Sequence, residues 1–267
     1  MKFTALMPVH DGIPYNLLKK ATNSVLHNTL APDEFIVIAD GLISQKKKNF
    51  LIVKKKNYFF IKLVFKKKIG ISRILNYGLK ISKYNIIARV DADDINNKYR
   101  FFKQIKFFRK NNLDILGSNI EEDINKKKYI KKVPHKPNLL SFFLRNPINH
   151  MSVMYRKDKI IKLGGYPEIK FKEDYALWLL AKMNGYNIAN LQETLVKSRL
   201  NVLTLERRKN IKAIISEFKI QLLILKKKPY LIFISFIFFF IRVFILLLPN
   251  SIYLFVVRRF NRSNVNV

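Results

Sequence analysis

Short apolar runs alternate with amphipathic segments over residues 1–118 of the chain. Runs rich in β-branched and aromatic residues predict strands at residues 3–9, 34–39, 59–65, 85–90 and 114–118. Apolar residues at helical spacing predict helices at residues 14–27, 72–81 and 99–110. Strands that alternate with helices predict an α/β fold with a mostly parallel sheet, in which ligands bind where the strands end.

The chain divides into parts of different composition. Residues 1–118 carry the alternating pattern, whereas residues 119–200 begin with a polar segment and include a predicted helix at 173–184. Residues 201–267 are first basic and then strongly apolar. We predict one domain over residues 1–200, in two parts at about 1–118 and 119–200, and a C-terminal helical appendage over residues 201–267.

The composition excludes some classes of protein and leaves others open. Apolar residues make up 49% of the chain, which indicates a folded protein rather than a disordered one. The chain has no cysteine, which excludes disulfides, thiolate catalysis and cysteine-bound zinc. The formal charge of +33 attracts nucleic acid, anionic lipid and phosphorylated substrates alike, so it selects no partner.

Much of the positive charge lies in lysine runs between apolar segments. These runs stand at residues 46–48, 54–56, 66–68 and 126–128. We interpret them as solvated loops and strand ends. Because the runs are scattered and no nucleic-acid motif accompanies them, we expect no nucleic-acid partner. A basic nucleic-acid-binding protein is the rival hypothesis, and a non-catalytic membrane scaffold with the same fold is a third.

Three carboxylates, Asp91, Asp93 and Asp94, directly follow the strand predicted at residues 85–90. The alternate positions 91 and 93 can turn to the same side and share a hard cation, and Mg²⁺ or Mn²⁺ takes oxygen ligands while it binds substrate phosphates. The alternative is a surface turn that caps the next helix, since aspartate favours both positions. The preceding strand and a second acidic pair downstream favour the metal site.

Four segments in order give the chain a family resemblance. They are Met7-Pro8-Val9-His10, Ile38-Ala39-Asp40-Gly41, Ala88-Arg89-Val90-Asp91-Ala92-Asp93-Asp94 and Glu173-Asp174-Tyr175-Ala176-Leu177-Trp178. With this order and spacing, the chain resembles the inverting glycosyltransferases of family 2 over about residues 3–200. The resemblance implies a GT-A fold, which is a Rossmann-like sheet flanked by helices, and a nucleotide-sugar donor.

The resemblance implies roles for two of these segments in holding the nucleotide. Pro8, Val9 and His10 would line the nucleotide pocket, and Asp40 would accept a hydrogen bond from the base. Taken alone, the first segment is equally a plain strand end. Asp40 with Gly41, taken alone, is better interpreted as a turn.

Further donor contacts are implied near the acidic cluster. Asp91 would contact the donor near its ribose, and Asp93 would be the protein ligand of Mg²⁺ or Mn²⁺. Gly70, Arg73 and Asn76 stand where the family has a stretch that faces the donor, so Arg73 and Asn76 would reach the diphosphate or the sugar. Because Arg73 replaces a smaller residue, a solvated helix face is an equal alternative.

The Glu173-Asp174 pair resembles the family's acidic pair, whose aspartate is the general base. An inverting transfer needs a carboxylate that takes the proton of the acceptor hydroxyl, and we assign this role to Asp174 with Glu173 in support. The alternative is charge that favours a helix N-terminus. His150 also matches a recurring histidine, although a structural role is commoner, and Trp178 is expected in the core or in the acceptor pocket wall.

The C-terminal appendage contains an apolar run, Tyr230–Leu248, that is interrupted only by Arg242. It is nearly long enough to cross a bilayer. Basic residues stand on both sides, at 226–228 and 258–259. They favour a helical hairpin that lies in the membrane interface or re-enters it, with residues 252–257 as its second arm, over a single spanning helix. A helix buried in the core is the third interpretation.

These observations together predict a metal-dependent glycosyltransferase. We expect it to move one sugar, from a UDP-sugar, to a lipid-linked or saccharide acceptor in the assembly of a cell-surface polysaccharide or lipopolysaccharide. The processive family motif is absent from its expected place near residues 197–199, which favours a single transfer. We expect the protein at an anionic membrane surface, on the cytoplasmic face of a bacterial inner membrane.

Overall fold

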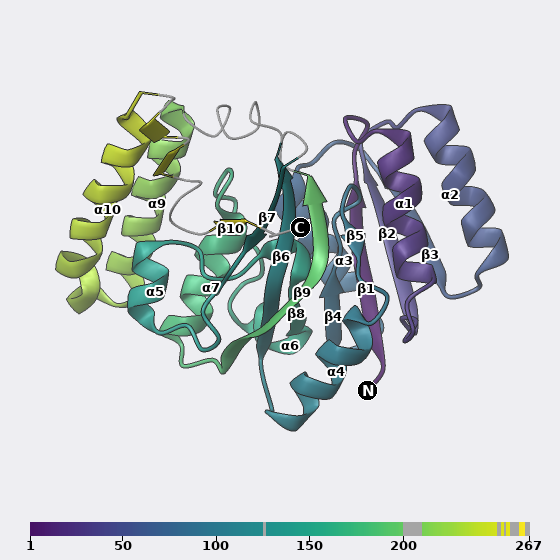
Figure 1. The fold of residues 1–267 in the computed structure, drawn as a ribbon, viewed down its shortest axis with the longest axis horizontal. Helices are drawn as coiled ribbons and strands as arrows, with labels where there is room; N and C mark the ends of the chain where they lie inside the picture. Colours follow the sequence, from purple (N-terminus) through teal and green to yellow (C-terminus); the bar gives the residue numbers. More distant parts are fainter. Residues whose placement is uncertain (125–126, 200–209, 250–251, 254, 257–261, 265–267) are drawn as a thin grey trace.

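A computed structural model describes residues 1–124, 127–199, 210–249, 252–253, 255–256 and 262–264. Its centre is a ten-stranded sheet in the order β10-β7-β6-β8-β4-β1-β2-β3, to which β9 and β5 are joined through β6 (Figure 1). The strands are β1 (Phe3–Val9), β2 (Glu34–Asp40), β3 (Ile61–Lys66), β4 (Ile86–Arg89), β5 (Ile95–Asn96), β6 (Ile115–Ile124), β7 (Lys127–Lys131), β8 (Met154–Arg156), β9 (Ile188–Arg199) and β10 (Arg262–Asn264). The helices are α1 (Tyr15–Leu26), α2 (Gln45–Asn57), α3 (Ile71–Ile81), α4 (Arg100–Lys110), α5 (Leu139–Leu144), α6 (Lys157–Lys162), α7 (Glu173–Met183), α9 (Ile211–Lys227) and α10 (Ile232–Leu247).

The first half of the sheet is parallel, as the alternating pattern predicts. Strands β3, β2, β1 and β4 lie side by side in parallel pairs. Strand β1 is buried on both faces: Phe3, Met7 and Val9 pack on one side with α1 and α4, and Leu6 packs on the other with α3 and α7. A strand covered by helices on both faces needs a continuous apolar run, which explains the sequence of this segment.

The second half of the sheet is mixed. Strand β8 lies antiparallel between β4 and β6, and β6 pairs in parallel with β9. The strand predicted at 114–118 continues to Ile124 and forms an antiparallel pair with β7, so the polar segment predicted from residue 121 begins as paired strands. Pairing with neighbours on both sides satisfies the backbone here, although the side chains are polar.

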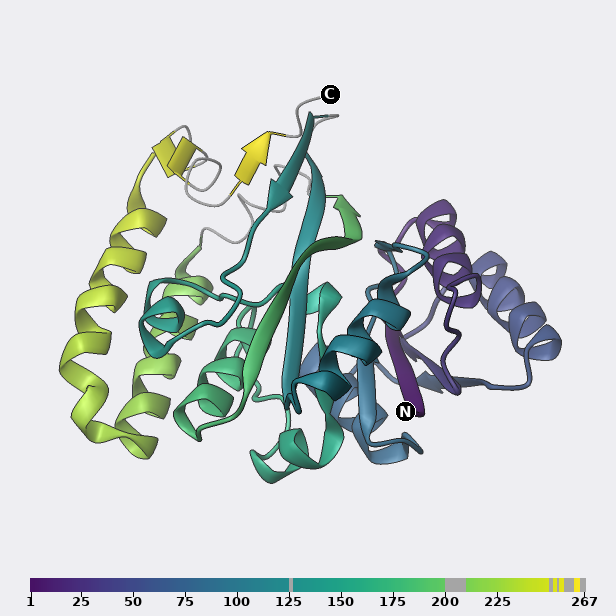
Figure 2. The same cartoon turned by 60° about the horizontal axis from the view of Figure 1, so that its bottom comes forward.

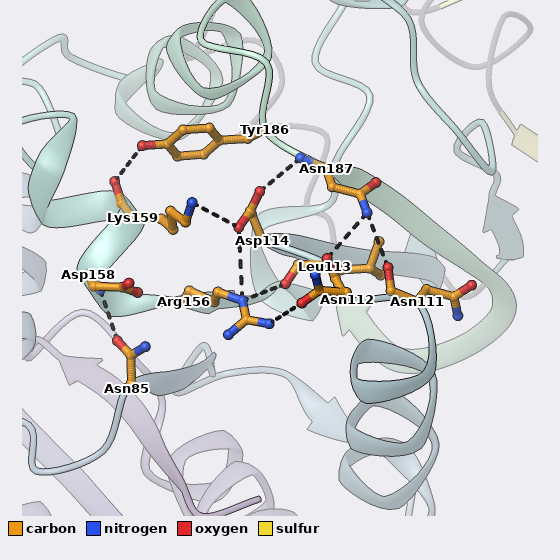
Figure 3. A network of polar contacts seen from close by, with 10 residues as sticks. All are labelled: Asn85, Asn111, Asn112, Leu113, Asp114, Arg156, Asp158, Lys159, Tyr186 and Asn187. Carbon is orange, nitrogen blue, oxygen red and sulfur yellow. Dashed lines mark hydrogen bonds and ion pairs between the residues drawn. The ribbon is translucent and has the colours of Figure 1, made fainter.

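A polar network around Asp114 fastens this half together at the edge away from the carboxyl ends of the parallel strands (Figure 3). Asp114 accepts a 2.9 Å hydrogen bond from the backbone N–H of Asn187 and lies 3.7 Å from the Lys159 ammonium and 3.9 Å from the Arg156 guanidinium. The network joins the start of β6 to α6, to the end of β8 and to the turn before β9.

Two of the lysine runs lie in a helix, so their interpretation as loops and strand ends is wrong. Residues 46–48 and 54–56 belong to α2, in which only Lys47 and Leu51 are buried. Because only a narrow face of α2 packs on the rest of the protein, its sequence does not show apolar residues at helical spacing. The run at 66–68 does begin at the end of β3, residues 127 and 128 begin β7, and residue 126 lies outside the described residues.

Most of the described C-terminal appendage is a helical hairpin, α9 and α10, at the opposite end of the molecule from α1 and α2 (Figures 1 and 2). The prediction that the appendage is helical throughout is wrong, because β10 pairs with β7 and so joins the central sheet. Helix α10 packs against α9 and against α5. The stretch Pro229–Leu247 is long and apolar enough to cross a membrane, and only 6% of its most apolar window is buried, which argues against a core helix. The second arm predicted at 252–257 lies only partly within the described residues.

Candidate active site

A cleft of about 1170 Å³ opens at the carboxyl ends of the parallel strands. It is lined by the segments after β1, β2, β3 and β4, by His150, and by the residues that lead into α7. From the residues predicted at the sequence level, the lining includes Pro8, Val9, His10, Asp40, Asp91, Asp93, His150 and Glu173. All four segments that carry the family resemblance therefore contribute to one cavity or border it.

Asp40 ends β2 and holds the loop that borders the cleft. Its carboxylate accepts hydrogen bonds from the backbone N–H groups of Ile69, at 2.7 Å, and Gly70, at 3.1 Å. Gly70 has φ of +91°, a conformation that residues with a Cβ rarely adopt. The pairing brings the loop after β3 to the mouth of the cleft, which Lys66, Lys67 and Lys68 make positive.

The loop after β1 is fixed by a residue that the sequence pattern did not indicate. Asp11 accepts hydrogen bonds of 2.8 Å from the backbone N–H of Ser44 and from the ammonium of Lys47. The hydrogen bond from Lys47 is the largest of the effects that lower the pKa of Asp11. Lys47 is buried, so this pair holds α2 against the loop that carries His10 into the cleft.

The acidic cluster after β4 divides into two sides. Asp91 and Asp93 line the cleft, as the alternation predicts, and Asp94 is buried outside its lining. Burial alone would raise the pKa of Asp91, but the positive charge of the neighbouring Arg89 outweighs it and the pKa is lowered. Burial and the charge of Asp91 raise the pKa of Asp93, and the same causes raise that of Asp94 well above its usual value. Of the three carboxyl groups, that of Asp91 is therefore the one whose surroundings favour the ionised form.

The donor atoms at this point fit a divalent cation shared with a substrate. Within the described ranges, no group of three or more His, Asp or Glu side chains is arranged around one ion position. Asp91 and Asp93 nevertheless present carboxylate oxygens to the same cleft. Mg²⁺ is commonly held by one or two carboxylates, with the remaining ligands being water and substrate phosphate, so a third protein ligand is not required.

The second acidic pair stands at the first turn of α7. Glu173 lines the cleft, whereas Asp174 is half-buried beside it and accepts a 2.8 Å hydrogen bond from the Asn146 side chain. His150 lines the cleft with Asp91 and Glu173, whereas Asp174 lies outside the lining. Burial lowers the pKa of His150, which keeps its imidazole neutral at pH 7.

Arg73 and Asn76 do not line the cleft. Arg73 forms an exposed 2.8 Å ion pair with Glu168. The Asn76 side chain accepts a hydrogen bond of 2.7 Å from the backbone N–H of Tyr166 and donates one of 2.9 Å to its carbonyl. In this geometry Asn76 holds the Gly164–Tyr166 loop against α3, and its contact with a donor stays a prediction.

Trp178 belongs to the core, which is one of its two predicted places. It is fully buried in an aromatic group with His150, Tyr155 and Tyr166. Burial raises the pKa of Tyr155 to about 12. The rings of Tyr166 and Trp178 pack against His150, which lines the cleft.

The chain is similar to known glycosyltransferases over nearly all of its length. The family model "Glycosyl transferase family 2" matches residues 4–164. An Escherichia coli protein, UDP-Gal:alpha-D-GlcNAc-diphosphoundecaprenol beta-1,3-galactosyltransferase, is 38% identical over 97% of this chain and 98% of its own. The amylovoran biosynthesis glycosyltransferase AmsE of Erwinia amylovora is 31% identical over 94% and 96%. The crystal structure of S. aureus TarS 1-349 shares the fold, with a TM-score of 0.66 and 18% identity over 85% of this chain and 66% of that one. With its GT-A-like sheet and these similarities, the chain belongs to glycosyltransferase family 2.

Proposed function

We propose that the protein transfers one sugar, with inversion at the anomeric carbon, from a UDP-sugar to a lipid-linked saccharide during assembly of a cell-surface polysaccharide. The observation that carries the proposal is that Asp91 and Asp93, which follow β4, line one cleft together with Glu173, the first residue of α7, and that Asp174 comes directly after Glu173 in the first turn of that helix. The E. coli relative is named for a UDP-Gal donor and a GlcNAc-diphosphoundecaprenol acceptor, and TarS has been crystallised with UDP and with UDP-GlcNAc.

The donor would lie along the carboxyl ends of β1, β2 and β4. Asp40 and the segment from Pro8 to His10 border the place for the nucleoside, and the lysines after β3 supply positive charge near its diphosphate. Asp93, with Asp91 beside it, would hold Mg²⁺ or Mn²⁺, which supplies positive charge to the leaving diphosphate.

The acceptor hydroxyl would enter from the α7 side. Its oxygen bonds to the anomeric carbon on the face opposite the diphosphate, the bond from that carbon to the diphosphate oxygen breaks, and UDP leaves. Asp174 takes the hydroxyl proton as this happens, because the attacking oxygen becomes more acidic as its new bond forms. The hydrogen bond from Asn146 fixes one carboxylate oxygen of Asp174.

The hairpin would place this site at an anionic membrane. Its first helix exposes Ile211, Ile215, Phe218, Leu222 and Leu225, and its second exposes Phe233, Ile237, Phe240, Phe244 and Leu247. Both sets are spaced by four, three, four and three residues, so each forms one stripe along its helix. Lysines at 212, 219 and 226–228 accompany them. Apolar stripes beside lysines favour binding in the interface of an anionic bilayer.

The packing of α10 supports a position in the plane of the membrane rather than across it. Arg242 in this helix is paired with Glu217 at 3.0 Å and also donates a hydrogen bond to the carbonyl of Phe143 in α5. The rings of Phe143 and Phe238 stack with centroids 6.1 Å apart. A helix that crossed the bilayer would have to leave these partners. We therefore propose a peripheral protein on the cytoplasmic face of a bacterial inner membrane.

A transfer assay with a defined acceptor tests the function. The full chain would be given UDP-galactose, a synthetic GlcNAc-diphosphate-lipid and Mn²⁺, with mass spectrometry and NMR of the product. We expect one added hexose in the inverted configuration, and an Asp174→Asn turnover lowered about 10² to 10⁴-fold. A product of retained configuration, or transfer from GDP-sugars but from no UDP-sugar, would refute the proposal.

Membrane binding is tested by flotation with vesicles. The wild type should float with vesicles that contain phosphatidylglycerol, and less so as salt increases, because screening weakens its attraction to the anionic surface. Replacing Phe233, Ile237 and Phe240 together by serine should lower the bound fraction. The matched control is serine at Phe102, which is an exposed phenylalanine of α4. Equal flotation of the two variants would count against the hairpin as the binding surface.

A further inference from the structure

Three charged side chains meet where the hairpin joins the catalytic domain. Glu217 of α9 is 1% exposed, and its two carboxylate oxygens take separate cations. Oε1 lies 2.5 Å from the Lys172 ammonium, and Oε2 lies 3.0 Å from Nε of Arg242 in α10. Burial alone would raise the pKa of Glu217, but the two cations outweigh it and lower the pKa, so the group is ionised at neutral pH.

One of these cations is the residue directly before α7. The carbonyl of Lys172 accepts the first backbone hydrogen bond of the helix, from Ala176 at 2.9 Å. The next two residues are Glu173, which lines the cleft, and Asp174, which accepts a hydrogen bond from Asn146. Fixing the Lys172 side chain on Glu217 therefore fixes the turn on which the proposed base stands.

The other cation, Arg242, is connected to Asp174 through contacts with α5 and the residues after it. Arg242 donates to the carbonyl of Phe143, which is next to last in α5. Asn146 follows that helix, and its side chain donates to Asp174. Between the two routes lies Tyr175, whose ring has Lys172 at 5.5 Å and Arg242 at 5.9 Å from its centroid and whose hydroxyl donates to the carbonyl of Phe142.

We propose that Glu217 and its two cation partners, Lys172 and Arg242, are positioning residues for the transfer reaction, which set the orientation of Asp174 from the contact between the α9–α10 hairpin and α7. The proposal rests on the proposed function of Asp174. Buried ion pairs are a weak source of net stability compared with apolar packing, and their directional contacts are better suited to fixing geometry. Arg242, the single charge in an apolar helix, then has a role that a membrane-spanning helix would not give it.

The test combines two single variants and their double variant in the full chain. Glu217→Gln removes the shared anion, and Lys172→Gln removes only the link to α7, while Arg242 and Glu217 remain paired. We expect each to lower kcat about tenfold to a hundredfold with KM for UDP-galactose nearly unchanged, because a small misplacement of a reacting group costs this much. The double variant should be no slower than Glu217→Gln, because that change already breaks the Lys172–Glu217 pair. Glu193→Gln, which removes an exposed ion pair with Lys103, is the control and should leave kcat unchanged.

Hydrogen exchange gives a readout that needs no substrate. Amide exchange at Ala176, Leu177 and Trp178 should be faster in Glu217→Gln and in Lys172→Gln than in Glu193→Gln. If Glu217→Gln does not fold, Lys172→Gln alone carries both measurements. Unchanged exchange, or faster exchange with an unchanged kcat, would overturn the proposal, as would additive losses in the double variant. Failure of the underlying function is separate, because it would be seen as an Asp174→Asn enzyme that retains its turnover.

Discussion

Arg89 and Asp91 form an ion pair in the wall of the cleft, at the end of β4 and in the turn that follows it. The Arg89 side chain is 2% exposed and that of Asp91 is 24% exposed. Arg89 also donates to the carbonyl of Val90, and its own carbonyl accepts a 2.8 Å hydrogen bond from Arg100. The pair keeps Asp91 ionised and fixes the turn that presents Asp93.

Arg89→Met should destabilise the protein more than an average substitution. Removing one partner of a buried ion pair leaves the other charge uncompensated, and we expect the free energy of unfolding to fall by about 3 to 5 kcal/mol. Urea denaturation of the full chain measures this change. Adding Asp91→Asn should restore part of the loss, because the remaining charge is then gone. Losses that simply add would show that the pair does not act as a unit.

Asp93→Asn should abolish donor binding that depends on a divalent cation, because it removes a cleft-lining carboxylate oxygen. Calorimetric titration of UDP with Mn²⁺, and again with EDTA, measures this dependence. The matched control is Asp94→Asn, which is next in sequence but outside the lining of the cleft. Because Asp94 is buried outside the lining, this variant should bind UDP nearly as the wild type does. Equal losses in the two variants would contradict the assignment of Asp93.

The parallel half of the fold and the cleft could be predicted because their signals are local. Strand β1 and the carboxylates Asp91 and Asp93 lie within runs whose period and turn residues decide their placement. Apolar periodicity does not predict α2, which buries few side chains, or β7, whose side chains are largely polar. Apolar periodicity therefore gives no signal for these two weakly covered elements.

Contacts between distant parts of the chain have no such signal. From the sequence, Arg242 is seen only as a charged residue that is unfavourable in an apolar helix. In the structure it is paired with Glu217, 25 residues away, and donates a hydrogen bond to the carbonyl of Phe143, 99 residues away. The link between Asp11 and Lys47 spans 36 residues. Asn76 was predicted from a family position, and its partners on Tyr166 lie 90 residues away. Only folding brings these groups together.

The Gly164–Tyr166 loop offers a paired test of packing against backbone strain. Both glycines have positive φ, +95° at Gly164 and +78° at Gly165, so alanine at either costs about 1 to 2 kcal/mol. A Cβ at Gly164 meets nothing within 4 Å, whereas one at Gly165 lies 2.4 Å from Oδ1 of Asn76. Gly165→Ala should therefore lower the thermal midpoint further than Gly164→Ala.

Asn76→Ala shows whether this contact decides the difference between the two glycines. In that background the two alanine variants should become similar in stability, because the clashing oxygen is gone. Thermal unfolding of the wild type, the three single variants and the two double variants in one buffer is sufficient. If the two alanine variants still differed in thermal midpoint, the clash would not be with Asn76. Such a result would count against a role of Asn76 in holding the loop.

The charge of Glu217 should make the stability of the hairpin contact depend on acid pH. Its pKa in the folded protein is lowered from 4.5, so the stabilisation is present at pH values above 4.5 and is lost as the pH falls through the folded pKa. At pH 7, Glu217→Gln should be less stable than the wild type by about 3 kcal/mol or more, because Lys172 and Arg242 lose their shared anion. The difference between the two proteins should shrink as the pH is lowered below 4.5, since the wild-type group then becomes neutral as well. Denaturant unfolding at a series of pH values measures it, with Glu193→Gln as the control, whose exposed pair contributes about 0 to 1 kcal/mol. A difference that stays constant down to the acid transition would mean that Glu217 contributes through its shape and not through its charge.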